Sequence, residues 1–129
     1  MSADGVGRAR SVLEALQDAV DSRDPERLIG LFADPAVLIG TSGDGRDRAG
    51  LRSYLTEVAT QPESLRWDWH DVVPFHDEPD VLAFAAFGDV VVSDGSTEQR
   101  APIRASLVAA PVDGGWRIKH FHGSIPSVV

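Results

Sequence analysis

Residues 116–124 of the chain read Trp-Arg-Ile-Lys-His-Phe-His-Gly-Ser, the clearest strand signal in the sequence. Gly114-Gly115 precedes this stretch and Pro126 follows it, so we expect one strand with a break at each end. Two histidines next to the apolar Trp116 and Ile118 suggest polar functional groups on an otherwise hydrophobic surface. Because side chains alternate along a strand, we predict one face with Trp116, Ile118, His120 and His122, and another with Arg117, Lys119 and Phe121.

A sequence pattern with a period of two residues, typical of strands, extends over most of the C-terminal half of the chain. Three further segments alternate in the same way, and the breaks between them are short and rich in Asp, Gly, Pro or Ser, as hairpin turns are. These segments predict one antiparallel, strongly bent sheet. Its expected strands are Leu65–Phe75, Val81–Val92, Arg100–Ala110 and Trp116–His122.

The N-terminal half has apolar residues at helical spacing. Asp24-Pro25 is a typical helix start, with Asp24 as the N-cap and Pro25 at the first helical position. The expected fold class is therefore α+β, with three N-terminal helices packed on one face of a strongly curved antiparallel sheet. The predicted segments are helices over 6–22, 25–34 and 48–60, a short strand over Ala36–Ile39, and a loop over Thr41–Asp47.

Composition narrows the class of protein. The chain has 129 residues, enough for one domain with a real core, and a formal net charge of -8, which disfavours binding to nucleic acid. It has no cysteine, which excludes disulfides, thiolate nucleophiles and cysteine metal sites. Neither a signal core nor a membrane-length apolar run is present, so we expect a cytoplasmic protein without a membrane or nucleic-acid partner.

One strand predicts self-association. The run Val81–Phe87 is apolar at both parities, so both of its faces are expected to be covered. Helices can cover only one face of the sheet. We therefore expect a second copy of the chain on the other face, giving a homodimer.

The order of elements, with Leu31-Phe32-Ala33-Asp34 entering a strand, resembles the nuclear transport factor 2-like superfamily. The ending over residues 116–126 resembles its SnoaL-like branch and also the association domain of calcium/calmodulin-dependent kinase II. The resemblance implies one domain over residues 1–129, with its core at about 6–126. It also implies a cone-shaped fold with a pocket at the open end. Members include isomerases, hydrolases, cyclases, dehydratases and binding modules, so the fold does not assign an activity.

The sequence departs from two of these relatives. Ketosteroid isomerases of the superfamily use a general-base Asp after the first strand and a Tyr on the first helix. Those positions align with Gly40 and about Leu16 here, so neither group is present. The kinase association domain has an Arg directly after its His-Phe-His, where this chain has Gly123.

Candidate catalytic residues are His120, His122 and Asp89. Two histidines spaced by two form a weak metal signal without a third ligand, so we predict no metal site, and we expect no organic cofactor. In a pocket the histidines would serve as acid–base or hydrogen-bonding groups. Asp89 either pairs with Arg104 inside the pocket or is turned to solvent by a bulge at Gly88.

Candidate ligand-binding residues are Arg104, Ser106, Trp67, Trp69 and Tyr54. Arg104 would hold a carboxylate or another planar anion, unless it is a surface residue. The two tryptophans either form an aromatic pocket wall or fill the core or a dimer interface. Tyr54 either presents its hydroxyl at the pocket mouth or packs in the core.

Two functions follow from this interpretation. The first is a small-molecule-binding SnoaL-like protein, whose pocket supports isomerase, cyclase or hydrolase chemistry on a small anionic or carbonyl substrate if it is an enzyme. The second is a non-catalytic dimerisation or association module. A water-excluded pocket with a paired His and carboxylate would favour the first, and an apolar-filled cone would favour the second.

Overall fold

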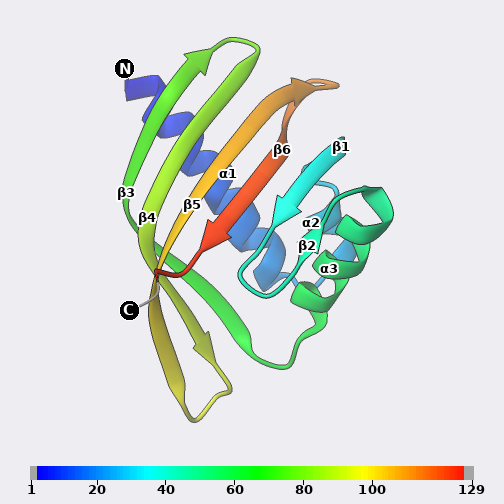
Figure 1. Cartoon of the computed structure of the whole chain (residues 1–129), viewed down its shortest axis with the longest axis vertical. Helices are drawn as coiled ribbons and strands as arrows, with labels where there is room; N and C mark the ends of the chain where they lie inside the picture. The colour runs from blue at the N-terminus through cyan, green and yellow to red at the C-terminus, as the bar shows by residue number, and fades with distance from the viewer. Residues whose placement is uncertain (1–2, 127–129) are drawn as a thin grey trace.

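The computed structural model describes residues 3–126, which form an α+β fold with helices on one face of a curved sheet (Figure 1). In Figure 1, α1 runs behind the sheet, and the opposite, outer face of the sheet is turned toward the viewer. No helix in this part of the chain is long and apolar enough to cross a membrane. The elements in order are α1 (Ala3–Asp21), α2 (Pro25–Ile29), β1 (Phe32–Ile39), β2 (Asp44–Gly45), α3 (Arg48–Thr60), β3 (Ser64–Glu78), β4 (Val81–Ser93), β5 (Glu98–Val112) and β6 (Gly115–Ser124).

Six strands form one sheet in the order β2-β1-β6-β5-β4-β3. The three hairpin-connected pairs from β3 to β6 are antiparallel, as expected from the short breaks between them. β1 lies parallel to β6, and β2 pairs antiparallel with β1 at the edge. The last strand therefore lies in the middle of the sheet, between β1 and β5.

α2 and α3 begin at the predicted residues, whereas α1 begins at Ala3, three residues before the predicted start. The Asp24 carboxylate accepts hydrogen bonds from the backbone N–H groups of Glu26 (3.0 Å) and Arg27 (3.4 Å), and Asp47 accepts one from Gly50 (2.8 Å). The face of α1 that packs on the sheet is apolar, because a period of 3.6 brings its apolar positions together. Its buried hydrophobic residues are Ala9, Leu13, Leu16, Ala19 and Val20.

The arrangement of the helices differs from the expectation in two ways. The structure has three helices within residues 3–126, but α2 has only five residues and α3 follows β1 and β2 instead of preceding the sheet. The predicted second helix extended to Asp34, whereas Phe32 and Ala33 already belong to β1. The sheet is also not purely antiparallel, since β1 and β6 are parallel.

A bulge in β6 changes which side chains share a face. Val108 pairs with His120 and Ala109 pairs with Ile118, so Lys119 is an extra residue on β6. The alternation is therefore reset at Lys119. Ile118 and Phe121 both face the core, whereas His120 and His122 face outward. The predicted grouping of Ile118 with the histidines, and of Phe121 with Lys119, was wrong for this reason.

Candidate functional site

The cone interior holds a small apolar cavity of about 80 Å³, here called the interior cavity. Leu16 and Gly40, the two positions that align with catalytic groups of ketosteroid isomerases, both line it. Among residues 3–126 no polar or charged residue is fully buried, so the cavity has no buried acid or base. Its lining includes Leu16, Val20, Phe32, Leu38, Gly40, Thr41, Tyr54, Leu55, Val58, Leu65, Trp67, Val90, Ile103 and Phe121.

Tyr54 is the aromatic residue that supplies a polar group to the interior cavity. Its hydroxyl lies 3.3 Å from the Ser42 hydroxyl, so the two groups can share one hydrogen bond. A Cβ atom at Gly40 would lie only 2.1 Å from the Tyr54 hydroxyl oxygen, and one at Gly43 would lie 3.0 Å from its ring. The glycines of this segment therefore leave room for the tyrosine, which is half-buried.

Trp67 and Trp69 lie on the inner face of β3, against α1. Their rings are stacked, with centroids 6.5 Å apart and planes 15° apart. Gln17 of α1 fixes this part of β3, because its amide oxygen accepts from the Trp67 backbone N–H and its amide nitrogen donates to the Leu65 carbonyl, both at 2.9 Å. Trp67 also lines the interior cavity, whereas Trp69 does not.

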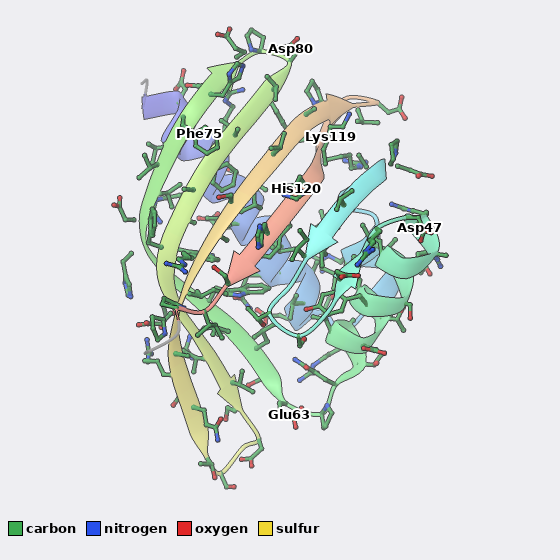
Figure 2. All side chains as sticks on the ribbon, viewed as in Figure 1. Asp47, Glu63, Phe75, Asp80, Lys119 and His120 are labelled. Atoms are coloured by element: carbon green, nitrogen blue, oxygen red, sulfur yellow. The ribbon has the colours of Figure 1, made fainter. Side chains whose placement is uncertain are left out.

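The histidines lie on the outer face of the sheet, opposite the tryptophans. Figure 2 shows His120 on the outer side of β6, away from α1. The Nδ1 of His120 donates to the Val37 carbonyl of β1 at 3.0 Å. The two imidazole rings are 6.4 Å apart and roughly perpendicular. Because the histidines and the tryptophans occupy opposite faces, they cannot line one pocket.

Three of the predicted site residues do come together on the outer face. Arg104, Ser106 and His122 line a depression of about 290 Å³, here called the outer depression, with Phe87 and Ser124. The Nε of Arg104 donates to the Ser124 hydroxyl at 3.1 Å, and no carboxylate pairs with Arg104 in residues 3–126. The depression therefore contains a solvent-exposed guanidinium that can accept an anion.

Asp89 belongs to a separate charge network on the same face. Its carboxylate accepts from Nη1 of Arg100 at 2.9 Å and lies 3.2 Å from Nε2 of His70. The hydrogen bonds to His70 and then Arg100 hold the pKa of Asp89 below its usual value. The neighbouring Asp68 has a lowered pKa as well, chiefly through its hydrogen bond to Arg66. Asp89 is thus an ionised partner of cations, not a proton donor at neutral pH.

No cluster of three or more His, Asp or Glu side chains in residues 3–126 has the arrangement of a metal site. A larger cavity lies elsewhere, between α1 and β6, with a volume of about 880 Å³. Sequence reasoning did not find this cavity, here called the α1–β6 groove. One sequence feature could have indicated the groove: Gly7, Ser11 and Ala15 are spaced by four, which places small side chains on one face of α1.

The sequence matches the SnoaL-like domain over residues 9–127. The chain belongs to the SnoaL-like domain family. A search of curated proteins finds no match. Solved structures confirm that the fold resembles that of nuclear transport factor 2-like proteins and of the kinase association domain.

The structural relatives show the fold at low sequence identity. A candidate dehydratase of the nuclear transport factor 2-like family from Streptomyces avermitilis has a TM-score of 0.83 and 14% identity, over 98% of this chain and 100% of that one. A candidate calcium/calmodulin-dependent kinase II association domain from Xanthomonas campestris has a TM-score of 0.77 and 19% identity, over 95% and 88%. A nuclear transport factor 2-like protein of unknown function from Pseudomonas putida KT2440 has the same TM-score and identity, over 99% and 91%.

Proposed function

We propose that this chain is an association module that forms a homodimer through the outer face of its sheet. The observation that carries the proposal is the row of exposed apolar side chains on this face. Val73 and Phe87 are each 44% exposed, and Val37 and Ile39 are 39% and 37% exposed. The register places all four on the outer face with Ala85, Ser106 and the histidines.

The sheet face opposite the helices has no other cover within residues 3–126 (Figure 1). Burying apolar surface stabilises a complex by about 25 cal/mol per Å², so packing this face against the same face of a second copy would stabilise the dimer. A two-fold symmetric dimer presents the same patch from both chains, which suits a face with an apolar centre. The charge network of Arg66, Asp68, Arg100 and Asp89 would then form part of the polar rim.

The interior cavity gives less support to acid–base catalysis than the outer face gives to association. Its volume of about 80 Å³ is well below the roughly 300–1,000 Å³ of ordinary ligand pockets. A general acid or base must lie within hydrogen-bond reach of the substrate, whereas His120, His122 and Asp89 all lie outside the cone. The fold shared with the association domain from Xanthomonas campestris is consistent with a module whose task is assembly.

Light scattering tests the proposal, because a dimer has about twice the chain mass of 13.8 kDa. Phe87→Glu should shift the protein toward the monomer, since two unpaired carboxylates would be buried in the interface. Ala49→Glu, at an exposed position of α3, is the matched control and should leave the mass unchanged. A wild-type protein with the mass of one chain at high micromolar concentration would contradict the proposal.

A second candidate function is small-molecule binding in the interior cavity. The observation that favours it is the hydroxyl of Tyr54, which lines an otherwise largely apolar space. A small carbonyl compound could accept a hydrogen bond from this hydroxyl while its apolar part entered the cavity. A thermal-shift screen of such compounds on wild type and Tyr54→Phe separates this candidate from pure association, which predicts no stabilisation by any of them.

A further inference from the structure

The outer depression lies on the sheet face that we propose for association, the face turned toward the viewer in Figure 1. Its lining side chains occupy neighbouring positions of β4, β5 and β6, in two rows set by the register of the sheet. The first row is Phe87, Arg104 and Ser124, and the second is Ala85, Ser106 and His122. Opposite residues on neighbouring strands have Cβ atoms about 4.5–5.5 Å apart, so the polar groups of both rows share one small patch.

The polar groups of the depression are mainly hydrogen-bond donors. The Nε of Arg104 donates to the Ser124 hydroxyl at 3.1 Å, and neither of its Nη groups has a partner within residues 3–126. The hydroxyls of Ser106 and Ser124 can each donate one hydrogen bond, and the imidazole of His122 can donate another. No carboxylate from this part of the chain lines the depression. A ligand there therefore meets several donors and a permanent positive charge.

The charges around the depression also favour an anion. Asp89 lies diagonally across from Arg104, but its carboxylate is already held by Arg100 and His70. Asp71 lies in the same row as Arg104, on the far side of Phe87. The formal net charge of -8 repels anions at long range, yet salt screens charges beyond about 8 Å at physiological ionic strength. The nearby guanidinium therefore determines the sign of the ligand.

Phe87 links the depression to the association face. Its side chain is 44% exposed, lines the depression, and belongs to the row of apolar residues that the proposed dimer buries. A partner chain that covers Phe87 also covers Arg104, which lies directly opposite on β5. The guanidinium cannot release its proton, and removing it from water without a counter-charge is costly. An anion bound in the depression offsets this cost.

From this combination we propose that the outer depression binds a small oxyanion, a carboxylate or a phosphate, and that a second copy of the chain closes over it. The anion accepts hydrogen bonds from the Nη groups of Arg104 and from the hydroxyls of Ser106 and Ser124. The inference rests on the proposed association function and adds a ligand to it. Since the anion binds the closed dimer more tightly than the open single chain, it must strengthen the dimer by the same factor.

The dimer dissociation constant tests this coupling. Sedimentation of a dilution series is measured in a buffer of low anion content, and then with sodium phosphate, sodium acetate or sodium chloride at equal ionic strength. At least one of phosphate and acetate should tighten the wild-type dimer by about tenfold, within the roughly 5–150-fold range of such couplings. Which of the two acts assigns the chemistry of the ligand. Chloride should have little effect, because it has no pair of oxygens to match the guanidinium.

Arg104→Gln tests whether the guanidinium is the group that the anion neutralises. Without an oxyanion this variant should dimerise at least as tightly as wild type, because it buries no unpaired charge. It should not respond to phosphate or acetate. Arg10→Gln removes the same charge at an exposed position of α1, on the helical side, and should respond as wild type does. Ser106→Ala removes one donor and should reduce the response several-fold.

Three results would overturn the proposal. One is a wild-type dimer whose dissociation constant is the same with and without oxyanions. Another is an equal effect of chloride, which would show general screening. The third is a weaker dimer of Arg104→Gln in the buffer of low anion content, because the partner chain would then supply the carboxylate, with Asp71 as the candidate. These results leave the association function intact, whereas a wild type that stays a single chain in every buffer contradicts both.

Discussion

Arg100 holds Asp89 across the outer face, with its Nη1 2.9 Å from the Asp89 carboxylate oxygen. Arg104, which one of the two alternatives paired with Asp89, instead donates to the Ser124 hydroxyl. Asp89 lies opposite Pro102 on β5, so Arg100 and Arg104 are both two positions away on the same face, and the guanidinium of Arg100 is the one that reaches the carboxylate. The carboxylate is therefore part of an exposed ion-pair network, and the guanidinium of Arg104 is left for other anions.

The Asp89 network predicts a stability difference that depends on pH. Because the folded-state pKa of Asp89 is below its unfolded value, its ionised form stabilises the fold above the unfolded pKa, and this stability is lost as pH falls through the folded pKa. Asp89→Asn should therefore be less stable than wild type by a constant amount above about pH 5, and the difference should shrink below about pH 4. Urea unfolding across this range measures it.

The control for this experiment is Asp80→Asn in the β3–β4 turn, at the position labelled in Figure 2. Asp80 has no ion-pair partner within residues 3–126. This variant should show no comparable pH-dependent difference from wild type. Equal pH dependence in Asp89→Asn and wild type would show that the network contributes nothing to stability.

Arg104 predicts anion binding at the outer depression. Small carboxylates should raise the melting temperature of wild type, because they bind the folded state only. Arg104→Lys keeps the charge but loses the planar pair of donors, so it should reduce the stabilisation, by up to roughly 1 kcal/mol at this exposed position. A thermal-shift series with acetate, benzoate and succinate on both proteins measures this. If both respond alike to each anion, Arg104 does not recognise carboxylates.

The four strands β3 to β6 were predictable from sequence because turn residues separate them. The two-residue β2 lies in the segment predicted as a loop, and β1 begins at Phe32, before the predicted Ala36. Which face each residue occupies was less predictable. The bulge at Lys119 has no local sequence signature, yet it moves His120 and His122 to the face opposite Ile118. The early end of α2 was missed for a related reason, since Leu31-Phe32 suits a helix and a strand equally and pairing with β6 decides between them.

The candidate site was less predictable than the fold, because it depends on register and on gaps between elements. The outer depression brings Arg104, Ser106 and His122 together, but on the outer face of the sheet instead of in the expected cone pocket. The pairing of Asp89 required the register of β4 on β5, and the α1–β6 groove required the distance between a helix and a strand. Glycines and small residues on α1 were visible in the sequence, but only the packed structure shows that the space beside them is open.

Gly88 predicts a sharp difference between two glycine substitutions. A Cβ atom at Gly88 would lie 2.0 Å from the backbone oxygen of Asp68, which cannot move freely in the sheet. Gly88→Ala should therefore destabilise the fold by roughly 1–3 kcal/mol, the usual cost of overpacking. Gly7→Ala meets nothing within 4 Å and lies in a helix, so it should stabilise by about 0.5–1 kcal/mol. Chemical denaturation of both variants checks the pair, and equal effects would contradict the strand pairing at Gly88.

The position of Tyr54 in the lining predicts that removing its side chain will enlarge the interior cavity. Removing the side chain in Tyr54→Ala joins its space to the existing cavity of about 80 Å³, at a cost of about 2–4 kcal/mol for a partly buried aromatic residue. The enlarged cavity is largely apolar, so small aromatic molecules such as phenol or indole should bind it and restore part of the stability.

Tyr54→Phe is the matched control, because it keeps the ring and loses only the hydroxyl contact to Ser42. It should bind none of these molecules and lose less than about 1 kcal/mol. Thermal shifts of the three proteins with each compound measure both effects, and stabilisation of Tyr54→Phe equal to that of Tyr54→Ala would show that the compounds bind outside the cone.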